Sequence, residues 1–314
     1  MDYALNYSAA AAELIRRGAI EIDLFKCAAW PDMIASAQAL GRVYIHFPLR
    51  VGMGTGDALN TETNSAPDWN AIERMLAETS TPWINVHLGP RPEDHPAISV
   101  GSTAPADVEQ LTESLIRDVA AVVDRFGADR VLGENIFGAE GMHPRAAVLP
   151  NVVREVVETT GCGFLLDLSH ARLAAEELDM APKAYIEALP VDRIKEIHVT
   201  GIQRFGEQWV ARAQAMGMDK DTLRHLKGRR IDHLPMTSED WSFMRWSLAQ
   251  TRDGVWQAPD IVAFEYGGIG DFFRSTTVEE ALVVQVPRMY DLVKSEAALW
   301  VTQGGVPEPF WSSS

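Results

Sequence analysis

The sequence predicts an α/β protein built as a single (β/α)8 TIM barrel, and two observations support this prediction. Eight short runs rich in β-branched, Leu and Phe residues alternate with longer segments of helical period along the whole chain. Several of these runs are apolar over four or five positions, which is typical of parallel strands buried on both faces. Eight strands with intervening helices in one series favour the barrel over its main competitor, an open doubly wound sheet.

The strands and helices follow from these local patterns. The predicted strands cover residues 19–23, 43–47, 83–88, 130–134, 163–167, 194–199, 230–233 and 261–266. The predicted helices cover residues 8–17, 68–78, 106–126, 145–160, 238–249 and 278–299. Asp68 is an N-cap candidate, and Gly127 is a stop signal for the third helix.

The predicted domain organisation is one barrel over residues 1–303 with a helical insertion at residues 203–229. This insertion separates the sixth and seventh predicted strands and is longer than the regular spacing of the others. Residues 304–314 are rich in Gly, Pro and Ser and are expected to form a flexible tail.

Composition and charge exclude several classes of protein. The 314 residues include 44 acids and 28 Lys plus Arg, a net charge of −16, which argues against nucleic acid or an anionic membrane surface as partner. Cys27 and Cys162 are too few for a disulfide framework. The N-terminus does not resemble a signal peptide, and the longest apolar runs are too short to span a membrane. These features predict a cytoplasmic protein.

Acidic and imidazole side chains stand near the carboxyl end of every predicted strand. They are Asp23, His46, His87, Glu134, Asp167 with His170 three residues later, His198, Asp232 with His233, and Glu265. In a barrel these ends meet at the face where barrel enzymes build their sites. Buried carboxylates are costly unless neutralised, and His, Asp and Glu together suit iron, manganese or zinc. The pattern therefore predicts a site for two or three metal ions.

Each histidine taken alone is more simply explained as a hydrogen-bonded core or rim residue, so the prediction rests on the convergence of eight strands. Asp23 is the weakest member because Glu21 and Lys26 are close in sequence, and it is kept with His170 as a catalytic candidate. Three further histidines, His95, His143 and His225, lie in loop-like or basic sequence and are expected at the surface.

A series of segments resembles a known family. The segments VYIHFPL, INVHLGP, LGEN, LLDLSHARLAA, IKEIHVTG, IDHLPMTSEDW and AFEYGG follow one another as in the DUF692 family of multinuclear non-haem iron-dependent oxidases. That family is part of the xylose-isomerase-like barrel superfamily. The resemblance runs in patches from about residue 40 to residue 270 and is most specific at residues 165–201.

The resemblance implies an iron-dependent oxidase or oxygenase, with metal ligands at His46, His87, Glu134, Asp167, His198, Asp232 or His233, and Glu265. The chain departs from the family pattern in four places, one of which is that the insertion at 203–229 is longer than the pattern leads us to expect. His170 replaces an Asn, Asp232 and His233 are adjacent instead of separated by one residue, and Glu265 is followed by Tyr-Gly-Gly. The substrate is expected to be a peptide or a small molecule, with presentation by a partner protein left open.

Two hypotheses of function follow. The first is an iron-dependent oxidoreductase in which Arg50, Arg172 or Arg204 anchors a substrate carboxylate. The alternative is a redox-neutral sugar isomerase, epimerase or hydrolase of the xylose-isomerase-like kind, using manganese, magnesium or zinc as Lewis acid.

The insertion at 203–229 is expected to act as a lid. It is unusually basic for this acidic chain, and long barrel loops are often functional. Its removal is expected to weaken substrate binding and to leave thermal stability nearly intact.

Overall fold

The computed structural model describes residues 1–295 and divides the chain into two compact units. The first unit contains Met1–Cys27, Pro31–Val43 and the chain from His198 onward; the second contains Ala28–Trp30 and Tyr44–Ile197. The predicted tail and the last residues of the helix predicted at 278–299 lie outside the described residues. None of the described helices combines the length and hydropathy needed to cross a membrane.

The main sheet confirms the α/β class. Its ten strands follow the order β3-β2-β1-β12-β9-β8-β7-β6-β4-β5. Eight of them form the main series: β1 (Asp2–Asn6), β2 (Leu24–Cys27), β3 (Arg42–Ile45), β6 (Ile84–His87), β7 (Val131–Glu134), β8 (Gly163–Asp167), β9 (Ile194–Val199) and β12 (Ile261–Phe264). The short strands β4 (Leu49–Arg50) and β5 (Leu59–Asn60) pair antiparallel, and β4 pairs parallel with β6.

Six predicted strands match members of this series; of the other two, one is not a strand and one is a strand outside the main sheet. The first strand is not residues 19–23: β1 pairs parallel with both β12 and β2, and β2 starts at Leu24. The segment predicted as the seventh strand forms β11 (Arg230–Leu234), which pairs antiparallel with β10 (Gly201–Arg204) in a separate two-stranded sheet. The reason in both cases is pairing with distant residues, which local hydrophobicity does not reveal.

Helices of the first unit begin with α1 (Ala9–Arg16), whose first turn is capped because the Ser8 side chain accepts a hydrogen bond from the Ala11 amide. The remaining helices of its main body are α2 (Pro31–Gln38), α10 (Ser238–Arg252), α11 (Asp271–Thr276) and α12 (Glu279–Lys294). The α12 helix packs on α1 and β1 and covers the sheet on that side.

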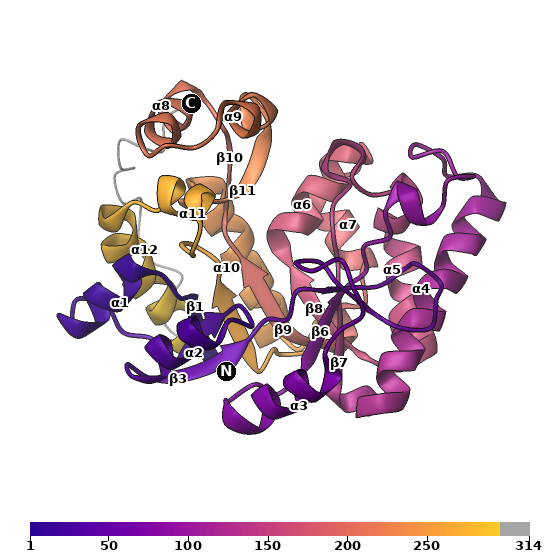
Figure 1. Cartoon of the computed structure of the whole chain (residues 1–314), viewed down its shortest axis with the longest axis horizontal. Helices are drawn as coiled ribbons and strands as arrows, with labels where there is room; N and C mark the ends of the chain where they lie inside the picture. Colours follow the sequence, from indigo (N-terminus) through magenta and orange to yellow (C-terminus); the bar gives the residue numbers. More distant parts are fainter. Residues whose placement is uncertain (296–314) are drawn as a thin grey trace. The chain divides into compact units, whose positions relative to one another are not determined.

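In the second unit, α3 (Trp69–Glu78) begins at the predicted cap Asp68, whose side chain accepts from the Ala71 amide. It is followed by α4 (Pro105–Phe126), α5 (Pro150–Thr160), α6 (Leu168–Glu177) and α7 (Pro182–Ala188), which lie beside β6, β7 and β8 in Figure 1. Leu111, Leu115, Val119 and Val122 of α4 are buried, and the helix ends at Gly127 with φ of 91°. The sheet is thus shielded by amphipathic helices.

The predicted insertion contains α8 (Glu207–Ala215) and α9 (Lys220–Leu226), which stand at the end of the β10–β11 ribbon in Figure 1. They have a core of their own, formed by Phe205, Trp209, Ala213, Met218, Leu223 and Leu234, with Phe272 of α11 packed against it. The Arg212 guanidinium also donates to the carbonyls of Ser275 and Thr277. Removing residues 203–227 would delete most of this core and expose Leu234 and Phe272, which pack against it, so the structure favours a loss of stability over the neutrality predicted from the sequence.

Candidate metal site

Three of the predicted ligands are the last residues of neighbouring strands in the second unit. His87 ends β6, Glu134 ends β7 and Asp167 ends β8. In the parallel register, His87 is directly opposite Glu134, so the two strands deliver their polar residues at one level. The buried residues before them anchor each strand in the core, and the polar side chain follows at its carboxyl end.

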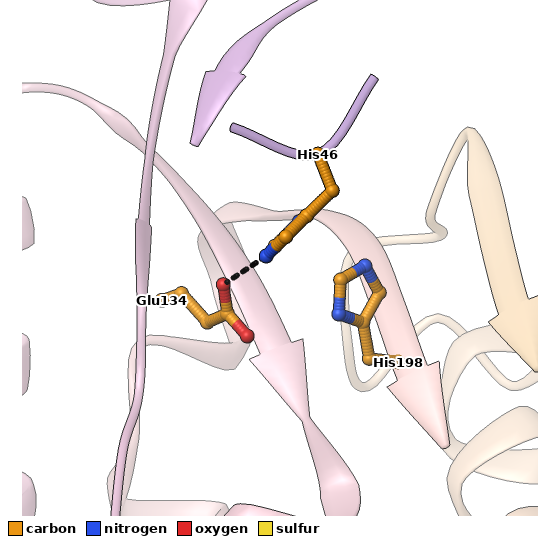
Figure 2. A group of neighbouring side chains, drawn as sticks. All are labelled: His46, Glu134 and His198. Atoms are coloured by element: carbon orange, nitrogen blue, oxygen red, sulfur yellow. Dashed lines mark ion pairs between the residues drawn. The ribbon is translucent and has the colours of Figure 1, made fainter. Parts of the chain in front are cut away.

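Glu134 lies at the centre of this group. Its side chain is 2% exposed, and its Oε2 atom lies 3.4 Å from His46 Nε2 and 3.3 Å from His87 Nε2. Figure 2 shows the His46 ring directed at the Glu134 carboxylate, with the ion pair drawn as a dashed line. The His46 and His87 rings meet edge to face, with their centroids 5.2 Å apart. Two imidazoles therefore face one buried carboxylate oxygen.

Asp167 and His170 extend the group on the next strand. Asp167 caps α6, since its Oδ1 accepts hydrogen bonds from the amides of Ser169 and His170. Its Oδ2 lies 3.6 Å from His170 Nδ1, which is also 4.0 Å from Glu134 Oε1. Glu134, Asp167 and His170 each offer a ligand atom, and these atoms lie within 4.8 Å of one another.

Backbone and amide groups hold these side chains in place. The Nδ1 atom of His87 lies 3.0 Å from the Leu49 carbonyl, which leaves Nε2 as the nitrogen facing Glu134. The Asn135 side chain accepts from the Asp167 amide and donates to the Asp167 carbonyl. Such outer partners orient metal ligands and set the histidine tautomer. The sequence reasoning missed Asn135, although it directly follows Glu134 in the LGEN segment.

The donor set of the second unit fits a metal ion. Donors bound to one ion at about 2.0–2.2 Å lie about 3–3.5 Å apart, and the two His–Glu134 distances of 3.3 and 3.4 Å agree with this spacing. Glu134 and Asp167 are buried carboxylates surrounded by imidazoles, and such a set without cysteine suits iron, manganese or zinc.

A second cluster lies in the first unit and centres on Glu265, which follows β12. Its Oε1 atom contacts the Lys26 ammonium and lies 3.1 Å from Nδ1 of His198, a residue of β9 that Figure 2 also draws. All three side chains are buried. Burial acts to raise the pKa of Glu265, but the charges of His198 and Lys26 outweigh it and hold that pKa well below its usual range. Lys26 was not among the predicted site residues.

Asp232 and His233 lie on β11, in the same unit. His233 Nδ1 is 3.0 Å from the Glu265 backbone carbonyl, and its Nε2 is 3.7 Å from Asp232 Oδ2. His233 has a φ of 58°, in the left-handed region that a non-glycine residue rarely adopts. The β10–β11 ribbon thus brings His233 to the end of β12, although β11 is outside the main sheet.

Several predicted positions need correction. Asp23 precedes β2 instead of ending a strand, and its carboxylate accepts a hydrogen bond from the Tyr3 amide and pairs with Lys294. His95 is buried, with Nε2 2.6 Å from the Gly52 carbonyl. His143 is half-buried, and burial lowers its pKa to about 4. These two were wrongly expected at the surface because a following proline says nothing about burial; His225 is exposed as predicted.

The three predicted substrate-binding arginines differ in their surroundings. Arg50 is buried and makes two hydrogen bonds to Asp94, at 2.6 and 3.2 Å. Arg172 is buried on α6. Arg204 is exposed and donates to the Gly228 carbonyl within the ribbon.

A buried carboxylate that the sequence did not single out holds the glycine-rich loop after β4. Asp118 of α4 accepts hydrogen bonds from the amides of Gly52, Gly54 and Gly56, at 2.7–2.9 Å. All three glycines have positive φ, and a Cβ at Gly52 would lie only 2.9 Å from Pro90. The loop continues directly from Val51, whose amide donates to the His87 carbonyl.

Comparisons with known proteins place these features in context. Residues 69–222 match the model of the RiPP precursor modification enzyme family MbnB/TglH/ChrH. A UPF0276 protein of Acaryochloris marina is 30% identical over 159 residues, and one of Caulobacter vibrioides is 26% identical over 152 residues. These alignments cover 49% and 47% of this chain and 53% and 52% of the relatives, so the chain spans about half of their length.

A solved structure shows similarity in fold. A xylose isomerase domain-containing protein of Salmonella typhimurium superposes with a TM-score of 0.51 at 16% identity, covering 94% of this chain and 97% of that protein. At this identity the similarity concerns the fold alone.

Proposed function

We propose that this chain is a metal-dependent oxidative enzyme acting on a precursor peptide, because residues 69–222 match the model of the MbnB/TglH/ChrH family of RiPP precursor modification enzymes. The observation that carries this proposal is the burial of Glu134 and Asp167 at adjacent strand ends, in contact with three imidazoles. We further propose that the fold is a (β/α)8 barrel of the xylose-isomerase-like kind with residues 203–229 as an insertion.

The metal of this proposal is iron, with two or three ions per chain. His46, His87, Glu134, Asp167 and His170 form one ligand group, and His198 with Asp232 or His233 supplies further ligands. When bound, iron would supply the one-electron redox chemistry that side chains lack. The chain's own contribution is positioning: the Leu49 carbonyl orients His87, and Asn135 holds the backbone of Asp167.

The substrate is proposed to be a peptide, with a partner protein as one way of presenting it. Arg172 and Arg204 remain proposed anchors for a carboxylate of the substrate. Arg50 is not proposed as a substrate anchor, because its guanidinium forms an ion pair with Asp94. That ion pair lowers the pKa of Asp94 against the opposing effect of burial, so the carboxylate stays charged and holds Arg50. The two free cysteines are buried, in keeping with action in the cytoplasm.

The experiment that tests the proposal combines metal analysis with turnover. Protein purified anaerobically without added metal should contain two or three iron ions per chain. With dioxygen and a cysteine-containing precursor peptide, mass spectrometry should detect an oxidative mass change. Glu134→Gln, which keeps size but removes charge, should lose iron and activity, whereas His225→Ala should retain both.

The redox-neutral alternative predicts another outcome. Manganese, magnesium or zinc would then be the resident metal, and turnover of a sugar substrate would proceed without dioxygen. That result, together with substoichiometric iron, would contradict the proposed oxidase.

A further inference from the structure

A buried lysine lies at the carboxyl end of β2, inside the cluster of the first unit. Lys26 pairs in register with Asn6 of β1, and Leu5 pairs with Phe264 on the other side of β1. Lys26 is the next-to-last residue of β2 and Glu265 directly follows β12, so the two residues lie at one level on the strands that flank β1. The backbones of strands two positions apart are separated by about 9.5 Å, a distance that the lysine and glutamate side chains span together.

The Lys26 ammonium is buried together with its partner, the Glu265 carboxylate. The Lys26 side chain is 8% exposed and that of Glu265 is 6% exposed, so the charges pair away from solvent. Lysine is almost never buried to this extent unless it is paired. The same carboxylate oxygen, Oε1, faces His198 Nδ1 at 3.1 Å. One carboxylate oxygen of Glu265 therefore contacts both the Lys26 ammonium and the His198 imidazole.

This arrangement resembles the surroundings of many metal-binding histidines. A metal-binding histidine usually has its other nitrogen directed at a carboxylate or carbonyl, which orients the ring. With Nδ1 of His198 facing Glu265, its Nε2 is the nitrogen that would bind a metal in this arrangement. Glu265 is then an orienting partner and not a ligand, and its negative charge is balanced by Lys26.

We propose that the Lys26 ammonium occupies the place of a metal ion at Glu265, so that this chain binds one ion fewer than it would with a neutral residue at position 26. Lys26 is a positioning residue in this scheme: it holds Glu265, and Glu265 orients His198. The inference rests on the proposed function because it assumes that His198 binds metal.

The test compares Lys26→Met with Lys26→Arg in the full chain, using Mn²⁺ as the probe. Met keeps the apolar stem without the charge, and Arg keeps the charge. After dialysis against excess Mn²⁺, Lys26→Met should contain one more Mn²⁺ per chain than the wild type by elemental analysis, and Lys26→Arg should match the wild type. The metal-free Lys26→Met protein should melt at a lower temperature, and Mn²⁺ should raise its Tm more than that of the wild type.

Equal Mn²⁺ content in Lys26→Met and the wild type, with equal Mn²⁺-dependent shifts in Tm, would overturn the inference. Glu265→Gln gives an independent check that does not depend on Lys26→Met folding. At saturating Mn²⁺ it should keep the wild-type number of ions with weaker affinity, and loss of one ion would show that Glu265 is a ligand and overturn the inference. A wild type without metal beside a Lys26→Met variant with one ion would support the inference and contradict the proposed function. Absence of metal from both would contradict both.

Discussion

The two carboxylate clusters differ in the side chains that face the carboxylates. In the second unit, the contacts described for Glu134 and Asp167 are with imidazoles and backbone amides. In the first unit, Glu265 contacts the Lys26 ammonium as well as the His198 imidazole.

The difference teaches what each cluster needs for stability. Glu134 and Asp167 are two buried carboxylates in one cluster, so removing one of them relieves their mutual repulsion in the metal-free protein, and an added metal ion would offset the same repulsion. A buried lysine–glutamate pair is already neutral, and removing one partner leaves the other charge uncompensated. The same kind of substitution should therefore have opposite effects on the free energy of unfolding of the metal-free protein.

The largest effect is expected from Glu134→Gln. It removes a ligand that faces both His46 and His87, so metal affinity should fall by more than about 100-fold, beyond what loss of an outer partner causes. Isothermal titration with Mn²⁺ measures this loss. In the metal-free state the variant should unfold at an equal or higher urea concentration than the wild type. A variant that kept wild-type affinity would remove Glu134 from the ligand set.

Lys26→Met should give the contrasting result in the metal-free protein. Leaving Glu265 buried without its cation should cost about 3–5 kcal/mol of unfolding free energy, measured by urea denaturation. Lys26→Arg should lose much less unfolding free energy, because it keeps the positive charge. If Lys26→Met and Glu134→Gln changed stability in the same direction, the contrast between the clusters would be wrong.

A smaller effect is expected from Asp118→Asn, which acts on the glycine loop beside His87. Replacing one acceptor oxygen with an amide breaks at least one of the three bonds to Gly52, Gly54 and Gly56, at a cost of about 1–3 kcal/mol. Since Val51 and Leu49 contact His87, metal affinity should fall about tenfold. Asp124→Asn, on the same helix, is the control. Unchanged affinity in Asp118→Asn would separate the loop from the site.

The smallest effect is expected from the protonation of His143 at acidic pH. Burial lowers the pKa of His143 from 6.5 to about 4. Between these two pH values the imidazole is mostly protonated in the unfolded chain and mostly neutral in the folded chain. The stability due to neutral His143 is complete above pH 6.5 and is lost as pH falls toward 4. The free energy of unfolding of the metal-free wild type should therefore fall by about 1 kcal/mol more than that of His143→Asn between pH 7.5 and pH 5.5. Parallel stability curves would contradict this assignment.

The sequence by itself determined the elements whose signals are local. The apolar runs before Glu134, Asp167 and His198 predicted β7, β8 and β9 with almost their observed bounds, and the same strands place these side chains at their ends. Asp68 likewise acts as the helix cap that its position indicated. Periodicity and capping depend on neighbours within a few residues, so one sequence is sufficient to see them.

Only the tertiary structure decided which segments join the sheet and which charges meet. The strand at Asp2–Asn6 is identified by partners more than 250 residues away in β12, and β11 is excluded from the main sheet by its pairing with β10. Asp23 and Lys26 are three residues apart, yet one pairs with Lys294 and the other with Glu265. Strand register and the start of β2 decide this outcome, because a shift of one residue turns a side chain to the opposite face of the sheet.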